Sequence, residues 1–201
     1  GSPVATDIDY ASGTKAVSLD GYSYFVVPAA SNPLAGATGM TLVAIFRPAG
    51  PGYVGAGFHQ GSGLIGMEQG GAVDDWGLGW NGNRIGAAAC STGVVERVAF
   101  TDPLPTYTLR VVMFTWNSAG VQQVFVNGVL ISSQDTGATT PRNPGDFALG
   151  AMSSVGGNPF YGEIAELRVY DSDESADAAT IASELWDTYA ASCLLDEGGL
   201  T

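Results

Sequence analysis

Residues 161–171 read Tyr-Gly-Glu-Ile-Ala-Glu-Leu-Arg-Val-Tyr-Asp, and this stretch decides the fold. Its side chains alternate between two sets, with Ile164, Glu166, Arg168 and Tyr170 in one set and Ala165, Leu167 and Val169 in the other. A period of two residues is typical of a β-strand that packs one face inward. The stretch therefore predicts a strand close to the end of the chain.

A short helix is expected directly after this strand. Residues 171–175 carry Asp and Ser side chains, whose oxygens cap helix N-termini. Ile181, Leu185 and Tyr189 then recur four residues apart, as they do on one face of an α-helix. We therefore expect a helix over residues 176–189.

The rest of the chain predicts strands and tight turns. Residues 40–47 and 108–116 are apolar on both alternating faces, which is typical of strands covered on both sides. Asn-Gly pairs at 81–82 and 127–128 predict two hairpins, and Asp20-Gly21 predicts a turn between two short strands. We expect an all-β chain, a two-sheet antiparallel jelly-roll sandwich with one short C-terminal helix.

Length and composition predict a single domain over residues 1–201, with Gly1-Ser2 resembling a cloning remnant. Twenty acidic residues against seven basic ones give a net charge of −13, which disfavours nucleic acid and anionic membrane surfaces as partners. No apolar run reaches the roughly 20 residues that span a bilayer, so membrane insertion is not expected either.

The two cysteines, Cys90 and Cys193, lie far apart in the sequence. They are compatible with a disulfide that closes a long loop, and equally with two separate buried thiols. With His59 as the single histidine, their spacing predicts neither a zinc site nor a redox pair.

The chain resembles laminin-G-like domains of the concanavalin A-like lectin/glucanase superfamily. The segments that carry the resemblance are residues 19–28, 41–48, 109–131, 147–150 and 160–171. The chain departs from the family pattern at Tyr107, where an aromatic-histidine opening is usual, and at Ala165, which is often Asp. The resemblance implies an extracellular or cell-surface protein that binds glycans or proteins, because only some branches of the family are enzymes.

Catalysis is not expected. The Glu-x-Asp-x-x-Glu strand of β-glucan hydrolases is absent from the sequence, and Glu163 and Glu166 are three residues apart. On a regular strand this spacing would point them to opposite faces. No cofactor is required by the sequence.

Sugars bind to aromatic faces together with carboxylate, amide and guanidinium groups. Residues 52–84 concentrate such side chains among glycines, and a further loop precedes residue 161. The residues expected to bind a glycan or polysaccharide are His59, Asp74, Asp75, Trp76, Asn81, Asn83, Arg84, Asn158 and Tyr161.

Calcium is a second expectation, since it takes six to eight oxygen ligands from carboxylates and carbonyls. The candidate ligands are Asp20, Asp74, Asp75 and Asp146. No continuous calcium-loop motif is present.

Three functions follow from these observations. The first is a non-catalytic carbohydrate-binding, lectin-like module. The second is a structural or adhesive module that binds a protein surface, for example in a surface or virion assembly. The third is a glycoside hydrolase or polysaccharide lyase with an unrecognised site. The fold alone does not separate them.

Overall fold

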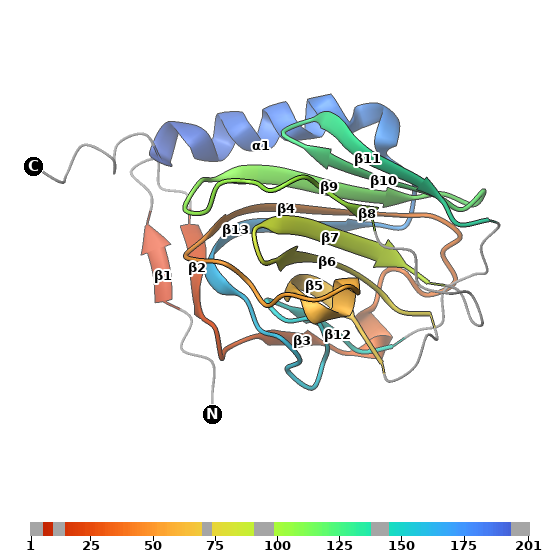
Figure 1. Cartoon of the computed structure of the whole chain (residues 1–201), viewed down its shortest axis with the longest axis horizontal. Coiled ribbons are helices and arrows are strands. Elements are labelled where there is room, and N and C mark those ends of the chain that lie inside the picture. Colours follow the sequence, from red (N-terminus) through yellow and green to blue (C-terminus); the bar gives the residue numbers. More distant parts are fainter. Residues whose placement is uncertain (1–5, 10–14, 70–73, 91–98, 138–144, 194–201) are drawn as a thin grey trace, which may run out of the picture.

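The computed structural model of the chain describes residues 6–9, 15–69, 74–90, 99–137 and 145–193. It is a sandwich of two antiparallel β-sheets, with seven strands in one sheet and six in the other. A long helix covers the outer face of the seven-stranded sheet (Figure 1). The prediction of an all-β, two-sheet sandwich with a C-terminal helix is confirmed.

The seven-stranded sheet contains both the first and the last strand of the chain. Its order is β1-β2-β13-β4-β9-β10-β11. The bounds are Thr6–Asp9 for β1, Lys15–Asp20 for β2, Met40–Pro48 for β4, Arg110–Trp116 for β9, Val121–Val126 for β10, Val129–Asp135 for β11 and Tyr161–Tyr170 for β13. The decisive strand, β13, therefore lies between β2 and β4 inside the sheet.

The six-stranded sheet is built from the middle of the chain, in the order β3-β12-β5-β6-β7-β8. Its bounds are Phe25–Val27 for β3, Ser62–Met67 for β5, Trp76–Asn81 for β6, Arg84–Ala89 for β7, Ala99–Phe100 for β8 and Phe147–Leu149 for β12. Three 3₁₀ helices, η1 (Ala29–Ser31), η2 (Phe58–Gln60) and η3 (Ser175–Asp177), join the elements.

Strands β4 and β9 lie side by side in the seven-stranded sheet and are buried on both faces, as their patterns predict. Alternate residues of β4, such as Phe46, face the core between the sheets. There the ring of Phe46 lies edge-on to Trp80 of β6 and to Phe160, with centroids 6.2 and 5.7 Å apart. The intervening residues, such as Ile45, face the helix on the other side.

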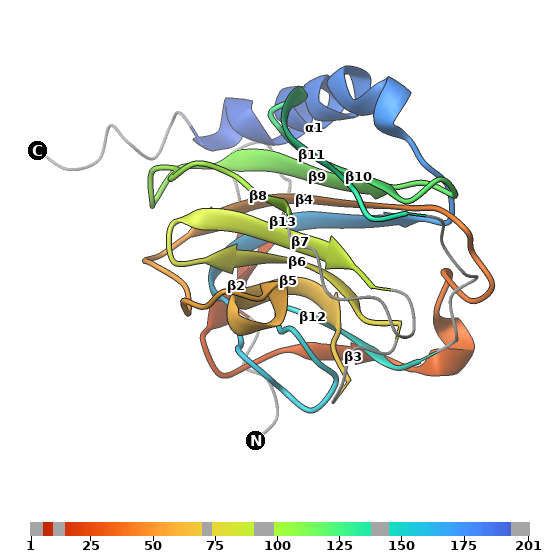
Figure 2. The same cartoon turned by 45° about the vertical axis from the view of Figure 1, so that its right-hand side comes forward.

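Helix α1 spans Ala178–Cys193, after η3. The predicted helix begins two residues early and ends four residues early, but its apolar face is correct. Ile181 and Leu185 pack with Ile45 and Met113 on the outer face of the seven-stranded sheet. The helix lies across this sheet in both side views (Figures 1 and 2). It explains why β4 and β9 carry no polar face.

The two Asn-Gly pairs behave differently. Asn127 (φ 50°) and Gly128 (φ 79°) form the two-residue turn of the β10–β11 hairpin, as type I′ requires. In the β6–β7 hairpin, Asn81 pairs with Arg84, so the turn is made by Gly82 and Asn83, one residue later than the pair suggests. Only Gly82 has a positive φ there, which fits a type II′ turn.

Strand β13 corrects one expectation from the sequence. Its register against β4 shifts between Ile164 and Glu166, so Ala165 is the extra residue of a β-bulge. Ile164 therefore faces the core, on the same side as Leu167. Glu163, opposite Arg47, and Glu166 both lie on the outer face, so the prediction that these two glutamates point to opposite faces is wrong.

Two further expectations concern pairing. The predicted strands on either side of Asp20-Gly21 exist, but β2 and β3 belong to different sheets, so this turn is a crossover. Cys90 is buried beside Phe58 and Met152 at the end of β7, whereas Cys193 ends α1. The end of β7 and the C-terminal end of α1 lie at opposite ends of the molecule (Figures 1 and 2). Whether the two cysteines pair stays a prediction.

Candidate functional site

Four exposed tyrosines gather at one end of the sandwich. Tyr22, Tyr53, Tyr107 and Tyr161 have 86%, 54%, 66% and 57% of their surface exposed. Aromatic side chains are often buried, so a group of four exposed ones around shared pockets is informative and marks a candidate binding surface. We call these four residues the tyrosine rim.

The sheet topology brings the rim together. Strand β2 ends at Asp20, β4 ends at Pro48, β9 begins at Arg110 and β13 begins at Tyr161. Because these strands pair antiparallel, their four ends lie at the same end of the sheet, on the left in Figure 1. Tyr22, Tyr53 and Tyr107 follow or precede these ends in connecting segments.

The first pocket of the rim has a volume of about 380 Å³. Tyr107 and Tyr161 line it, together with an ion pair between Arg47 and Glu163. Nε and Nη2 of Arg47 donate to the two carboxylate oxygens of Glu163 at 3.0 and 2.9 Å, a bidentate arrangement. Gly162 (φ 144°) lies between Tyr161 and Glu163 in the chain. A Cβ at this position would come within 2.4 Å of the Arg47 carbonyl oxygen. This pocket thus combines aromatic surface with fixed charged groups.

The second pocket, of about 280 Å³, lies on the other side of Tyr161. Tyr22 and Tyr53 line it, with Asp20 and Ser62 as its polar groups. Oδ1 of Asp20 accepts hydrogen bonds from the backbone N–H groups of Tyr22 and Ser23, at 2.9 and 2.8 Å. These two bonds lower the pKa of Asp20 below its usual value, so its carboxylate stays ionised.

The backbone holds Tyr53 in place. Its N–H donates to Oγ of Ser62 at 3.2 Å, and its carbonyl accepts from the N–H of Gly82 at 2.8 Å. Gly52 donates in turn to the carbonyl of Gly82 at 2.7 Å. The segment that carries Tyr53 is thereby fixed to β5 and to the β6–β7 turn.

Tyr107 has the left-handed φ of 60°, which is uncommon for a bulky side chain. Its N–H donates to the carbonyl of Pro48 at 3.0 Å. Arg110, which is 3% exposed, reaches back to the carbonyls of Pro105 and Thr108 on either side of Tyr107. Burial lowers the pKa of Arg110 to about 10. The strained tyrosine is thus held from both flanks.

Two of the residues predicted from the sequence line the pockets of the rim. Tyr161, predicted as a glycan contact, is exposed and lines both pockets. Asp20, predicted as a calcium ligand, pairs with Tyr161 across β2 and β13 and lines the second pocket. The sequence therefore predicted two of the residues that line these pockets, Tyr161 and Asp20.

Three other predicted residues are buried. Trp76 is completely buried and packs on Phe147, with ring centroids 5.3 Å apart, so the expectation that its ring is available to a sugar is wrong. Asp74 and Asp75 are buried as well, and Oδ1 of Asp75 accepts from the N–H of Gln69 at 3.0 Å. Their position in the fold supports a structural role.

The remaining predicted residues lie around η2 and the β6–β7 turn. Asn81 is buried and bonds the backbone of Gly55 in both directions. Asn83 and Arg84 are exposed on the turn. Nδ2 of Asn158 donates to the carbonyl of His59 at 2.8 Å. None of these residues lines either pocket of the rim.

The four candidate calcium ligands do not form one oxygen-rich group. Oδ1 of Asp146 accepts from the N–H of Ala29 at 2.7 Å, in a different place from Asp20. In the part of the chain that the structure describes, no group of three or more His, Cys, Asp or Glu side chains is arranged to hold a metal ion. The residues present therefore do not fit a shared calcium site, and calcium dependence stays a prediction.

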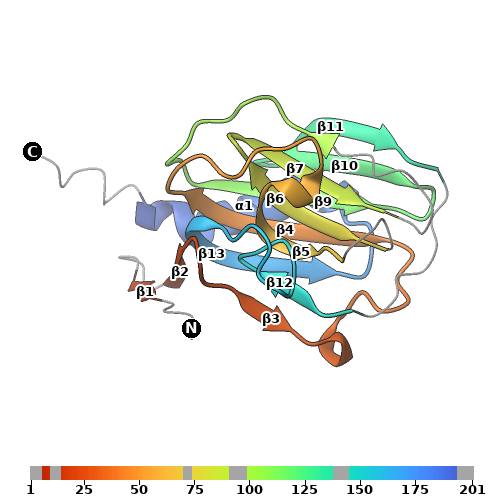
Figure 3. The same ribbon diagram turned by 60° about the horizontal axis from the view of Figure 1, so that its bottom comes forward.

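The outer face of the six-stranded sheet is covered by the chain itself. Helix η2 lies over this sheet, on the opposite side of the sandwich from α1 (Figure 3). Phe58 and Met152 are 1% exposed there. They fit against Gly77, where a Cβ would lie 2.9 and 3.0 Å from their side-chain atoms. These two side chains therefore cover the part of this face around Gly77.

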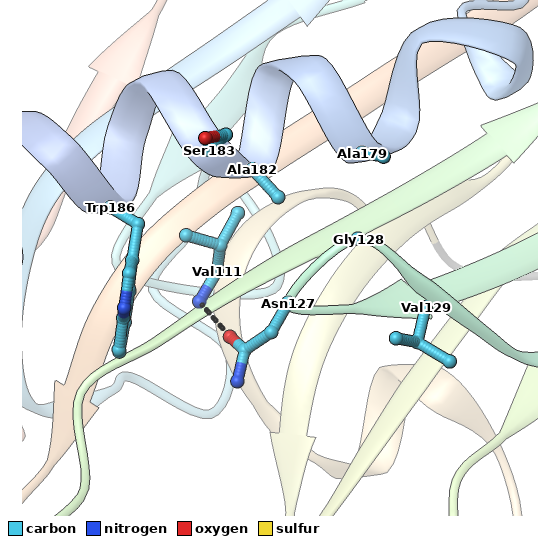
Figure 4. A pocket seen from close by; sticks show the side chains of 8 residues that line it. All are labelled: Val111, Asn127, Gly128, Val129, Ala179, Ala182, Ser183 and Trp186. Atoms are coloured by element: carbon cyan, nitrogen blue, oxygen red, sulfur yellow. Dashed lines mark hydrogen bonds between the residues drawn. The ribbon is translucent and has the colours of Figure 1, made fainter.

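A further pocket of about 360 Å³ lies between α1 and the β10–β11 turn. In Figure 4, Trp186 stands at one end of it, Val129 at the other, and Ala182 points into it from the helix. Oδ1 of Asn127 accepts from the N–H of Val111 at 3.0 Å beneath it. The lining is mainly apolar and lacks charged groups, so it differs in kind from the rim.

The sequence analysis did not name Tyr22, Tyr53, Tyr107, Arg47 or Glu163 as site residues. A signal was present, because three rim tyrosines stand beside turn residues in Gly21-Tyr22, Gly52-Tyr53 and Pro105-Thr106-Tyr107. Aromatic side chains in turns often remain exposed, since connecting segments run over the surface. Which turns meet depends on strand order, which local patterns do not fix.

Comparisons with known structures agree with this fold. Domain 4 of AbnA, a GH43 extracellular arabinanase from Geobacillus stearothermophilus solved in complex with arabinotriose, superposes with a TM-score of 0.64 at 21% identity, over 89% of this chain and 81% of that one. The binding domain of Paraclostridial Mosquitocidal Protein 1 has a TM-score of 0.70 at 10% identity, over 93% of this chain and 47% of that one.

Domains LG4-5 of the mouse laminin alpha1 chain superpose with a TM-score of 0.54 at 15% identity, over 83% of this chain and 41% of that one. The chain thus spans less than half of the toxin domain and of the laminin pair. At these identities the likeness is one of fold.

The comparison with curated proteins finds no match. Within the described residues, no helix is long and apolar enough to cross a membrane. The family described as the concanavalin A-like lectin/glucanases superfamily matches residues 19–180, which include all of β4, β9 and β13 and the start of α1. The chain belongs to the concanavalin A-like lectin/glucanase superfamily.

Proposed function

We propose that this chain is a non-catalytic carbohydrate-binding module of an extracellular or cell-surface protein, and that it binds its glycan at the tyrosine rim. The observation that carries the proposal is the grouping of four exposed tyrosines around two pockets that also contain Arg47, Glu163 and Asp20.

The chemistry of the rim suits a sugar. Tyrosine rings offer flat apolar faces to the C–H groups of a sugar ring, and their phenol groups form hydrogen bonds. The Arg47–Glu163 pair presents both donors and acceptors to hydroxyl groups in a fixed geometry. Because the backbone already holds Tyr53 and Tyr107, binding requires little ordering of the site.

The comparisons support the same proposal. The superfamily name covers lectins, and the arabinanase domain was solved with arabinotriose bound. That enzyme is described as extracellular, which agrees with the location proposed here.

A binding role without catalysis is supported by the two glutamates on the outer face of β13. Glu163 is engaged by Arg47, and Glu166 accepts hydrogen bonds from Arg168 at 2.5 Å and from the Tyr189 hydroxyl at 2.7 Å. Glycoside hydrolysis needs one carboxyl group to donate a proton and another to act as nucleophile or base. Carboxylates committed to ion pairs are poorly suited to these roles.

A reducing-sugar assay on polysaccharides, run beside binding measurements, tests both parts. Binding without product release is the expected result. Product release by the wild-type protein that Glu163→Gln abolishes would instead identify an enzyme.

The second candidate is a module that binds protein. Strand β11 is an edge strand, and Val129, Leu130 and Ile131 are about half exposed along it. Exposed apolar edges promote strand pairing with other chains. Concentration-dependent self-association in light scattering, abolished by Leu130→Lys and accompanied by no response to sugars, would favour this candidate.

A further inference from the structure

The two pockets of the tyrosine rim share one wall. Tyr161 lines both of them, so they are neighbours. In the sheet, Glu163 pairs with Ser18 on one side and with Arg47 on the other, while Tyr161 pairs with Asp20 in the adjacent row. Two residues along a strand separate these rows, about 7 Å. Because side chains two residues apart on a strand share a face, the two rows place polar and aromatic groups side by side.

Each pocket also has aromatic groups of its own. Tyr107 lines the first pocket and not the second, while Tyr22 and Tyr53 line the second and not the first. A ligand that fills one pocket alone would leave at least one exposed tyrosine without a contact. A ligand that fills both would contact the whole rim and cover Tyr161 on its two sides.

The charge of the rim selects the kind of sugar. The lining residues carry two carboxylates, Asp20 and Glu163, and one guanidinium, Arg47, which is already paired with Glu163. The pKa of Asp20 is lowered, so its charge persists. A net charge of −13 repels anionic ligands at long range as well. Uronic, sialic and sulfated sugars are therefore disfavoured.

We infer that the rim consists of two adjacent subsites for a neutral, linear oligosaccharide, with Tyr161 in contact with a sugar residue in each. This inference rests on the proposed carbohydrate-binding function. It identifies the ligand as a chain of at least two neutral sugar residues. A single sugar, by contrast, fills only one subsite.

Titration calorimetry with sugars of increasing length tests the inference. The probes are cello-, arabino-, xylo-, manno- and galacto-oligosaccharides of one to six residues, with oligogalacturonides as the anionic series. For at least one neutral series, affinity should rise tenfold or more between the monosaccharide and the trisaccharide. The oligogalacturonides should bind at least tenfold more weakly than that series.

Variants assign the two subsites. Tyr107→Ala should lower the ratio of trisaccharide to monosaccharide affinity at least fivefold. Tyr161→Ala should weaken the binding of every member of the series. Trp186→Ala, an exposed aromatic that lines neither pocket, should behave as the wild type.

The outcomes separate the two proposals. Equal affinity for monosaccharide and trisaccharide would overturn the two subsites and leave the carbohydrate-binding function intact. Tighter binding of oligogalacturonides would overturn the neutral ligand alone. A length gain that Tyr107→Ala leaves unchanged would show that no subsite lies at the first pocket and would overturn the assignment. No binding of any probe would overturn the proposed function and this inference with it.

Discussion

The guanidinium carbon of Arg110 lies 5.0 Å from the centroid of the Trp80 ring, inside the end of the sandwich that carries the tyrosine rim. Strand β9 supplies the arginine and β6 the tryptophan, so the contact joins the two sheets. Because Arg110 also bonds the carbonyls of Pro105 and Thr108, it connects the core to the segment that presents Tyr107. The buried Arg110 side chain therefore holds the surface segment that carries Tyr107.

The first prediction concerns this connection. Arg110→Met keeps the apolar stem but leaves both carbonyls without their donor, so Tyr107 loses its fixed position. We expect glycan affinity to fall about tenfold, equivalent to about 1.4 kcal/mol. The melting temperature should change little, because the cost of burying the Arg110 charge is removed at the same time. Calorimetry and thermal unfolding measure the two effects.

Arg84→Met is the matched control, since Arg84 is exposed on the β6–β7 turn and lines neither rim pocket. Its affinity should equal that of the wild type. A larger loss for Arg84→Met than for Arg110→Met would move the site to the turn that the sequence analysis favoured.

The second prediction concerns the Arg47–Glu163 pair. Both side chains are about one-fifth to one-quarter exposed and the contact is bidentate, so the pair should exceed ordinary surface pairs. A double-mutant cycle of Arg47→Met and Glu163→Gln should give a coupling of about 1 kcal/mol in the free energy of unfolding, measured with urea. Strictly additive effects would show that the pair does not hold the strands together.

The third prediction concerns pH. Burial, and then the hydrogen bond to Glu166, raise the pKa of Tyr189 from 10.0 to about 12. Because the folded pKa lies above the unfolded one, this stabilisation is complete below about pH 10 and is lost as the pH rises towards 12. Tyr189→Phe should therefore be less stable than the wild type at pH 8 and approach it at pH 11.5.

Urea unfolding followed by tryptophan fluorescence at the two pH values gives this difference. Other groups that titrate in the same range are common to both proteins and cancel in the comparison. A difference in stability that stays constant with pH would mean that the Tyr189 hydroxyl does not bond Glu166.

The fourth prediction concerns the covered face of the six-stranded sheet. Gly77→Ala places a Cβ against Phe58 and Met152, so it should lower the free energy of unfolding by about 1–3 kcal/mol. Gly50→Ala is the control, because no atom lies within 4 Å of its added Cβ. Glycan affinity should be unchanged in both variants. Tighter or weaker binding by Gly77→Ala would implicate this face as the site.

The fold was largely predictable, because its strongest signals are local. Strands β4 and β9 are apolar on both faces, a pattern typical of strands covered on both sides, as they are here by the second sheet and by α1. The bulge at Ala165 was not predictable, since its cause is the register against β4 rather than the sequence of β13. That single extra residue moved Glu163 and Glu166 to the same face.

The site was predictable only in part. Trp76 alternates with Leu78 and Trp80, a period of two that places all three in the core, and the neighbouring aspartates obscured it. Tyr161 was identified because it ends a polar loop that precedes the decisive strand. Its partners around the rim come from connections far apart in the chain, and only the strand order brings them together.

A glycan array probed with the wild-type protein and with Tyr161→Ala, each with millimolar calcium and with chelator, tests the central claim most directly. Hits that survive chelation would show binding without calcium. The account predicts that the wild-type protein binds neutral glycans and that Tyr161→Ala, with an unchanged melting temperature, loses them. A silent array for the wild type, or the same hits for Tyr161→Ala, would contradict it.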